Sequence, residues 1–376
     1  MPARSRRTAP PHAPKYLRVY SALRRDIESG RWKEGEQLPS ELELVRTFGV
    51  SRITVTRAVR DLFHHGLVER LAGSGTFIKR GHPGAHHSFG LLIPELGDTE
   101  IFEPICQGMM ASPHSRDCAL VWGGAGSQDA TKEARAINLC RQFVGRSVSG
   151  VFFAPLEHID SKDAVNRRIL QMLDDARIPV VLLDRPAAPF PQTGRHDLVG
   201  IDNRRAGYVL TQHLIRRGCR RVGFVGPPHA AATVAARAAG YREALFVHGL
   251  DMTATWAQPL DPDDVAGVKQ MLTSMRPDAL VCHNDRTAGR LMHTLRLLDY
   301  RVPDDIRLVG VDDVDYARLL PVPLTTLRQP TRQIGDAALT LMLERIRRRT
   351  LPPRELRLDC ELIVRESCGA KLPRAA

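Results

Sequence analysis

The sequence contains no cysteine pair, no long apolar run and no apolar leader. Its seven cysteines are scattered and no two form a CxxC pair, which indicates reduced thiols rather than a disulfide framework or a zinc site. Its uncharged apolar runs, such as residues 149–155, are far shorter than the roughly 20 residues that cross a bilayer. The basic N-terminus lacks the apolar core of a signal peptide, so we expect a cytoplasmic protein that contacts no membrane.

The chain also lacks the common motifs of enzymes. The glycines within residues 123–126 have neither the third glycine nor the spacing of a dinucleotide fingerprint, and no GxxxxGK(S/T), HExxH or Ser/His/Asp pattern is visible. Lone histidines such as His213 and His248 lie on helical patterns, which is more typical of surface or core positions than of catalysts. We therefore expect neither an enzyme nor a cofactor; an enzyme of sugar or nucleotide metabolism remains the alternative.

The basic charge is concentrated at one end of the chain. The 376 residues suffice for two or three domains of ordinary globular composition. Residues 1–82 contain 16 Lys and Arg against 8 Asp and Glu, whereas the other 294 residues contain 38 against 34. Most of the net charge of +12 thus belongs to an N-terminal module, which predicts that this module contacts a polyanion.

The pattern of the N-terminal module begins with an arm and two helices. Residues 1–14 combine prolines and arginines without apolar periodicity, which is typical of a disordered arm. Apolar residues then recur at helical spacing from Tyr16 until Gly30. Ser40 and Glu43 form the signature of a capping box, so a second, short helix is predicted after Ser40.

A third helix and a hairpin complete the module. Ser51 is a good N-cap for a helix whose apolar stripe contains Val55, Ala58, Val59 and Leu62. Two strand-like runs with glycines between them follow, as in a β-hairpin. This order predicts a winged helix-turn-helix, in which the outward face of the third helix fits the major groove of DNA. The residues expected on that face are Arg52, Ile53, Thr56, Arg57 and Arg60. The alternative is an ordinary solvated helix face.

Residues 38–78, with the motifs LPSE, GVSR and GSGTF, resemble the DNA-binding domain of GntR-family transcription regulators. The resemblance implies DNA contacts from the third helix and from a wing that enters the adjacent minor groove. The DNA-contacting positions proposed in this way and from the outward face are Ser51, Arg52, Thr54, Thr56, Arg57, Gly73, Gly75 and Thr76. Many relatives have arginine where this chain has Leu42 and Thr56, so we expect an altered operator preference.

Residues 81–88 are rich in Gly, Pro and His and are expected to be a linker. His82, His86 and His87 lie in or beside it without carboxylate or thiolate companions, so we interpret them as polar spacing and expect no metal.

From residue 89 onward, strand-like runs alternate with amphipathic helices, which predicts a parallel α/β architecture large enough for two lobes. Ligands of such sheets bind beyond the carboxyl ends of the strands. Polar residues at these ends suit a small polyol, and a helical arginine can join them: the set is Asp184, Arg237, Asn284 and Asp312. The alternative is that a polar residue at a strand end only caps the next helix.

Segments including 199–226, 278–292 and 302–330 are similar to the effector domains of LacI/GalR repressors, which in turn resemble periplasmic sugar-binding proteins. The same four residues match that family's effector contacts, and others are expected in the loop from Glu95 to Phe102. The family usually stacks an aromatic side chain on the ligand; Trp256 is nearby in the sequence but does not align.

The two resemblances together are those of the arabinose-repressor subgroup. They imply a homodimer that binds a palindromic operator in double-stranded DNA, with its affinity controlled by a small-molecule effector, a sugar, between two lobes. A binding protein without a role at DNA is the alternative. We expect a basic arm at 1–14, a winged helix-turn-helix domain at 15–80, a linker at 81–88 and an effector-binding and dimerisation domain at 89–370.

Overall fold

We describe the protein from a computed structural model. It describes residues 15–28, 31–32, 35–64, 67–71, 75–78, 87–93, 100–122, 131–250 and 259–370. The chain divides into two compact units, Met1–His86 and His87–Ala376. Several positions considered above lie outside the described residues: the arm 1–14, Gly30, Gly73, His82, His86, Glu95 and Trp256.

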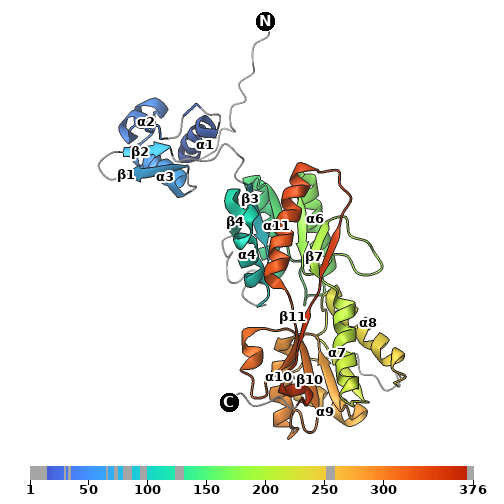
Figure 1. Cartoon of the computed structure of the whole chain (residues 1–376). Helices are drawn as coiled ribbons and strands as arrows, with labels where there is room; N and C mark the ends of the chain where they lie inside the picture. The colour runs from blue at the N-terminus through green and yellow to red at the C-terminus, as the bar shows by residue number, and fades with distance from the viewer. Residues whose placement is uncertain are drawn as a thin grey trace. The chain divides into compact units, whose positions relative to one another are not determined.

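The first unit contains three helices and a hairpin (Figure 1). Their bounds are α1 (Lys15–Glu28), α2 (Glu41–Phe48), α3 (Arg52–His64), β1 (Val68–Leu71) and β2 (Gly75–Ile78). The expected capping box is confirmed, because the Ser40 hydroxyl accepts from the amide of Glu43 and the Glu43 carboxylate accepts from the amide of Ser40. Gly49 then ends α2 with a φ of +62°, a conformation that glycine adopts without steric cost.

The core of this unit is the apolar stripe that the sequence predicts. Val55, Ala58, Val59 and Leu62 of α3 are all at most 1% exposed and pack with α1, α2 and the hairpin. The two strands pair antiparallel, with Leu71 opposite Gly75. Because the stripe is buried, the opposite face of α3 is left to solvent. The winged helix-turn-helix fold is confirmed.

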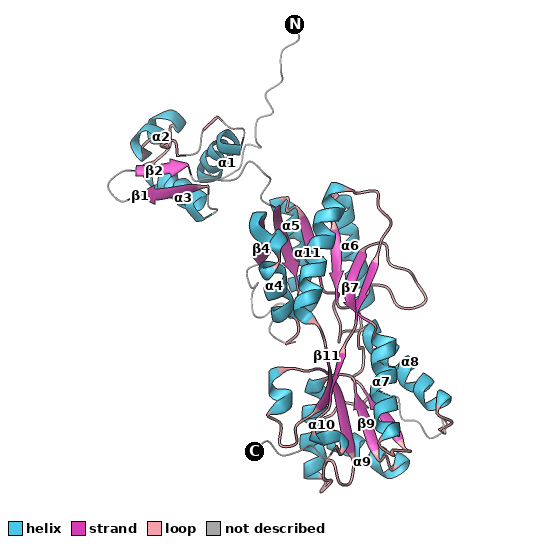
Figure 2. Ribbon diagram, viewed as in Figure 1, coloured by secondary structure: helices cyan, strands magenta, loops and turns pink. Residues whose placement is uncertain are grey.

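The second unit has two lobes, each built on its own sheet with helices on both faces (Figure 2). The sheet of the first lobe has six parallel strands, in the order β12 (Glu355–Leu358), β7 (Asp197–Ile201), β6 (Val180–Leu183), β5 (Gly150–Phe153), β3 (His87–Leu92) and β4 (Cys118–Trp122). One face is covered by α4 (Phe102–Ala111) and α11 (Thr331–Arg347), the other by α5 (Lys132–Arg146) and α6 (Lys162–Asp175). A short 3-10 helix, η1 (Pro113–Asp117), precedes β4.

The sheet of the second lobe has five strands, in the order β13 (Glu361–Ile363), β11 (Thr325–Arg328), β10 (Arg307–Asp312), β9 (Ala279–Cys282) and β8 (Val222–Val225). All pairs are parallel except that of β13 with β11. One face is covered by α7 (Asn203–Arg216) and α8 (Ala232–Val247), the other by α9 (Val265–Met275) and α10 (Asp285–Leu297). Two 3-10 helices, η2 (Asp315–Arg318) and η3 (Glu366–Cys368), complete this lobe.

The described chain passes between the lobes three times: after β7, after β11, and between β12 and β13 (Figure 1). The expected two-lobed parallel α/β architecture is therefore confirmed. The first strand starts earlier than the sequence pattern indicates, because His87 and Ser88 already pair with β4, and the His87 ring stacks on Phe89. Among the described residues, no helix has the length and apolar character needed to span a membrane.

Candidate functional sites

The outward face of α3 is basic and open to solvent. The Arg52 and Ile53 side chains are each 82% exposed, and Arg57 and Arg60 are exposed as well. Together with Thr56, these side chains line one open hollow of about 400 Å³. The five residues expected to face outward therefore share one surface, with Thr56 partly buried in it. Such a surface offers cations and an apolar group to a polyanion.

Neighbouring elements hold several polar side chains of this surface. The Thr56 hydroxyl donates to the Glu41 carboxylate of α2 over 2.8 Å, and the Arg57 guanidinium lies 3.9 Å from the centre of the Tyr16 ring. The Ser51 and Thr54 hydroxyls lie 2.8 Å apart, within hydrogen-bonding distance. These contacts fix the geometry of the face before any partner arrives, and the sequence pattern did not reveal them.

The start of the second hairpin strand is the described part of the expected wing. Gly75 has a φ of +118°, and a Cβ atom there would lie 2.5 Å from the side-chain nitrogen of Gln37. Gly75 is exposed and Thr76 partly so. The backbone conformation favours glycine at position 75, and a larger residue there would also displace the end of the Gln37 side chain.

In the second unit, polar residues gather where the strands of both lobes end. Asp184 follows β6 of the first lobe, and Asp312 ends β10 of the second. Both have positive φ values, +67° and +120°, which aspartate rarely adopts. Such backbone strain concentrates at binding sites, where the surrounding structure holds it in place. Arg237 of α8 interacts electrostatically with both carboxylates, so the three residues belong to one site between the lobes.

Arg237 reaches this site because α7 and α8 pack very closely. A Cβ atom on Gly207 would lie 1.9 Å from the carbonyl oxygen of Arg237, and one on Gly240 would lie 1.8 Å from that of Arg204. Glycine at these positions therefore allows the two backbones to touch. As a result the Arg237 Nε atom donates to Asn203 Oδ1 over 2.8 Å, and its Nη1 atom donates to the carbonyl of His283.

The other two predicted residues are partly committed to structure. The Asn284 side chain accepts from the amide of Thr287 over 2.9 Å and caps α10, which is the alternative raised for strand-end residues. Its amide nitrogen is left for another acceptor. The Asp312 carboxylate accepts from the Gln329 side chain over 2.7 Å. The structure thus brings Asp184, Arg237 and Asp312 together and places Asn284 directly after β9, beside His283.

The strand-end rule also points to Arg185, directly after Asp184, but it missed two other residues of this site, Glu157 and His283. Glu157, four residues after β5, pairs with the buried Arg185, which also lies 3.2 Å from Asp184. Glu157 accepts in addition from the amide of Ala231 in the other lobe. His283 is 6% exposed and interacts electrostatically with Arg237 and Glu157. Glu157 lies too far past its strand for the strand-end rule, and His283 immediately precedes the residue that was chosen.

Burial dominates the electrostatics of the site. It raises the pKa of Asp312 to about 7 against the attraction of Arg237, and raises the pKa of Asp184. Burial lowers the pKa of His283 to about 3, so this imidazole is neutral at physiological pH. Burial would also raise the pKa of Glu157, but the attractions of Arg185, His158 and His283 together outweigh it and lower that pKa to about 2. Glu157 and Arg185 therefore form a charged pair under all ordinary conditions.

Several polar atoms of the site have no partner. Among the described residues, the buried side-chain atoms without a hydrogen bond include Asp184 Oδ1, His283 Nδ1 and Gln329 Oε1. An unpaired buried polar atom costs about 1–3 kcal/mol, so such atoms call for a ligand or ordered water. A carboxylate and a carboxamide oxygen accept hydrogen bonds, and a neutral imidazole does so at one nitrogen. The site therefore suits a ligand that supplies hydroxyl donors.

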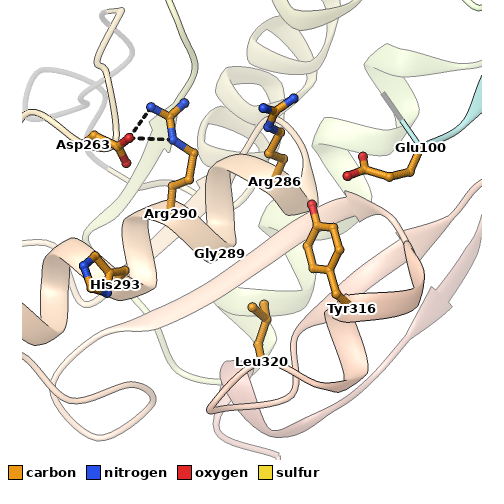
Figure 3. Close-up of a pocket in the computed structure, with 8 residues that line it drawn as sticks. All are labelled: Glu100, Asp263, Arg286, Gly289, Arg290, His293, Tyr316 and Leu320. Carbon is orange, nitrogen blue, oxygen red and sulfur yellow. Dashed lines mark hydrogen bonds and ion pairs between the residues drawn. The ribbon is translucent and has the colours of Figure 1, made fainter. Parts of the chain in front are cut away.

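A cavity of about 540 Å³ lies against α10, and its lining residue Glu100 interacts electrostatically with Asp312 (Figure 3). Its described lining includes Arg286, Arg290, Tyr316 and Glu100, and none of the four predicted effector residues. Arg290 is paired with Asp263 over 2.5 Å and with Asp261 over 3.1 Å. Among the described residues, no group of three or more His, Cys, Asp or Glu side chains is placed to bind a metal ion.

Two family models match the chain, one within each structural unit. Residues 15–78 match the model of bacterial regulatory proteins of the gntR family. Residues 211–368 match the model of a periplasmic binding protein-like domain. This range includes most of the second lobe.

Three relatives illustrate the similarity over greater lengths. The arabinose metabolism transcriptional repressor of Geobacillus stearothermophilus is 28% identical over 94% of this chain and 97% of its own length. A solved complex of the transcriptional regulator CelR with cellobiose has a TM-score of 0.62 and 27% identity, covering 85% of this chain and 91% of its own. A LacI-family regulator from Enterococcus faecalis with bound ribose has a TM-score of 0.60 and 26% identity, covering 74% and 98%.

Proposed function

We propose that this chain, in which a GntR-family domain is joined to a periplasmic binding protein-like domain, is a transcriptional repressor whose operator affinity is set by a small molecule bound between the lobes of the second unit. The observation that carries this proposal is the buried, strained and incompletely paired cluster of Asp184, Arg237 and Asp312 on a chain that also presents an exposed basic recognition helix.

The DNA contacts belong to α3 and the wing. The N-terminal residues of a recognition helix contact base edges, while basic residues further along reach phosphates. Arg52 is then the base-reading residue, and Arg57 and Arg60 bind the backbone. We assign positioning or backbone contacts to Ser51, Thr54, Thr56, Gly75 and Thr76; the contact proposed for Gly73 rests on the sequence, because this residue lies outside the described residues.

The active form is a homodimer on a palindromic operator, because two-fold symmetry of the protein is matched by two half-sites about 34 Å or a multiple apart along DNA. Exposed apolar side chains in the second lobe are in keeping with self-association: Leu319 is 75% and Leu297 57% exposed. Sedimentation of the full chain tests this. A chain that stays monomeric at micromolar concentration with operator present would exclude the dimer.

The effector is a neutral sugar. The site brings three carboxylates, those of Asp184, Asp312 and Glu157, against two guanidinium groups, those of Arg185 and Arg237. Sugar hydroxyls would satisfy the unpaired acceptors of the site. The ribose and cellobiose bound by two similar structures are in keeping with this chemistry.

The ligand acts by biasing the angle between the lobes. The site contains residues of both lobes, so a bound ligand favours the closed arrangement over the open one. A dimer in which the lobes close presents its DNA-binding units differently. A coupling of about 1–3 kcal/mol would change operator affinity some 5–150-fold.

Footprinting tests the DNA-binding part of the proposal. The purified full chain, at moderate salt, should protect a segment of the promoter region of its own gene, and the protection should weaken steeply as salt rises because counterions are displaced from phosphates. Absence of any protected segment would refute the proposal.

A variant tests the effector part. The effector is first identified by a thermal-shift screen of mono- and disaccharides, with purines as the alternative class of ligand. Asp312→Ala should then keep operator binding and lose its response to that effector. Arg301→Ala, which removes an exposed arginine that pairs with Asp304 and Asp305, is the matched control and should respond normally. A full response in Asp312→Ala would show that the ligand binds elsewhere.

We infer further that the chain has no catalytic role and acts in the cytoplasm, where its operator is. The similar proteins with known names are transcription regulators, which supports this assignment. Incubation of the purified chain with each effector found above should leave the effector chemically unchanged.

A further inference from the structure

The N-terminal end of α3 carries an apolar side chain that the described residues of its unit leave exposed. Ile53 is 82% exposed, whereas the four apolar residues of the buried stripe on the same helix are at most 1% exposed. Isoleucine is a poorer helix former than alanine, leucine or lysine, so helix stability does not explain its presence there. A single exposed apolar side chain is common on protein surfaces, so its meaning depends on the residues around it.

The neighbours of Ile53 identify the class of that molecule. Thr56, Arg57 and Arg60 follow Ile53 at three, four and seven residues, so they share its side of the helix, and all of them line one hollow with Arg52. The arginines favour a partner with many negative charges. The isoleucine between them favours a partner that also exposes an apolar group where the N-terminal end of the helix would contact it. In the major groove of DNA, the 5-methyl group of thymine is that group.

The polar side chains around Ile53 are already engaged within the protein. Thr56 donates to Glu41, Ser51 and Thr54 lie within hydrogen-bonding distance of each other, and Arg57 stacks on Tyr16. The Arg52 Nε atom lies 3.7 Å from the same Glu41 carboxylate. This arrangement holds the first turn of α3 in one conformation, with the Ile53 side chain presented at a fixed position on the reading face.

We propose that Ile53 is a specificity-determining residue that contacts the 5-methyl group of a thymine in each half-site. The inference rests on the proposed function, since it requires α3 to occupy the major groove. It assigns to this chain a methyl readout, in addition to the arginine contact expected one residue earlier. Each operator half-site then contains one thymine that cannot be replaced by uracil without weakening the binding of the protein, because uracil differs from thymine only by lacking the methyl group.

The test replaces single thymines of the protected segment by deoxyuridine. Once footprinting has located the segment, a set of duplexes carries dU at one thymine position of each half-site at a time. At the thymine that Ile53 contacts, loss of the buried methyl group should weaken binding of the full chain about three- to fivefold for each half-site. At the other thymine positions the substitution should have little effect. The measurement is the dissociation constant of each duplex at one fixed salt concentration.

A double-mutant cycle assigns the effect to the side chain. Ile53→Ala should bind the thymine duplex about as weakly as the original chain binds the dU duplex, and should no longer distinguish the two. Phe246→Ala is the matched control, because Phe246 is a 74% exposed apolar residue of α8 in the second unit; it should still distinguish the duplexes.

The outcomes separate the inference from the function beneath it. Binding that is unaffected by dU at every position, or a dU effect that persists in Ile53→Ala, would overturn the methyl contact while leaving the repressor assignment intact. Binding of Ile53→Ala that is unchanged on the thymine duplex would also overturn it. No sequence-specific binding at all, or a preference of the exposed face for anionic vesicles over operator DNA, would overturn both.

Discussion

Arg52 at the start of α3 is 82% exposed, whereas Arg185 and Arg237 between the lobes are 4% and 5% exposed. The side chain of Arg52 lies in water and its charge is screened by salt within about 10 Å. Each buried guanidinium instead lies beside carboxylates that have lost their water: Arg185 against Glu157 and Asp184, and Arg237 near Asp184 and Asp312.

The difference shows how one residue type serves two purposes. An exposed arginine contributes little to the stability of the fold, and it contributes to binding free energy when a polyanion binds the protein. A buried arginine is required as soon as the chain folds, because its partners cannot remain charged and alone. Each of the following predictions compares a change in one region with a matched change in the other or elsewhere.

The largest effect is expected from removing a buried cation. Arg185→Met would leave Glu157 and Asp184 without their closest cation, so the free energy of unfolding of the second unit should fall by about 3–5 kcal/mol. Arg204→Met, which removes an exposed arginine paired with Glu243, should change it by less than about 1 kcal/mol. Urea titration of the full chain provides both values, and equal losses would contradict the comparison.

Removing an exposed cation should affect DNA and not folding. Arg52→Ala should weaken operator binding by about 1–3 kcal/mol, provided that the guanidinium reads a base, while the free energy of unfolding changes by no more than about 0.5 kcal/mol. Arg167→Ala, at an exposed position of α6, should bind DNA normally. An unchanged operator affinity in Arg52→Ala would remove the base contact from this residue.

Effector binding should depend on pH in a range set by burial. Burial raises the pKa of Asp312 to about 7, and a sugar hydroxyl that donates to this group binds its ionised form better. The dissociation constant should therefore be about tenfold larger at pH 6 than at pH 8. Isothermal titration at the two pH values measures this, and the same constant at both would show that Asp312 does not accept from the ligand.

The same carboxyl group of Asp312 should make folding less stable as the pH rises, whereas it should make effector binding stronger. Its pKa in the folded protein lies above the ordinary value, so the folded state holds this proton more tightly than the unfolded chain does. Its contribution to stability is then present at low pH and is lost as the pH rises from about 4 to about 7. In Asp312→Asn this part of the pH dependence of unfolding should disappear.

The smallest effect concerns the salt dependence of DNA binding. If Arg60 pairs with a phosphate, Arg60→Ala should reduce the slope of log K against log salt by about 1 and weaken binding similarly for all sequences. The slope should not change in Arg204→Met. A loss of sequence preference without a change in slope would place Arg60 at a base instead.

The sequence predicted the elements whose signals are local. The stripe of α3, the capping box at Ser40 and the strand-like runs after residue 89 depend on periodicity and near neighbours, and each was found where expected. The short strands β7 and β11 to β13, and the helices α4 and α11, were not identified. These strands are defined by pairing with distant segments, which no local pattern encodes.

The candidate site shows the same division. The strand-end rule selected Asp184 and Asp312, which lie together with Arg237. It could not show that Asn284 caps α10, that Thr56 is bound by Glu41, or that Glu157 pairs with Arg185, because these contacts depend on side-chain directions and on loops folding back. Glu157 and Arg185 are 28 residues apart, and only the fold brings them together.

The contact between α7 and α8 at Gly207 and Gly240 limits how this protein can acquire a new ligand. Even one added methyl group at either glycine would collide with backbone atoms, so the two helices behave as a single rigid block with Arg237 mounted on it. A change of ligand preference must therefore come from the loops that face Arg237. The position of Arg237 itself stays constant, and every ligand of the site has to be compatible with it.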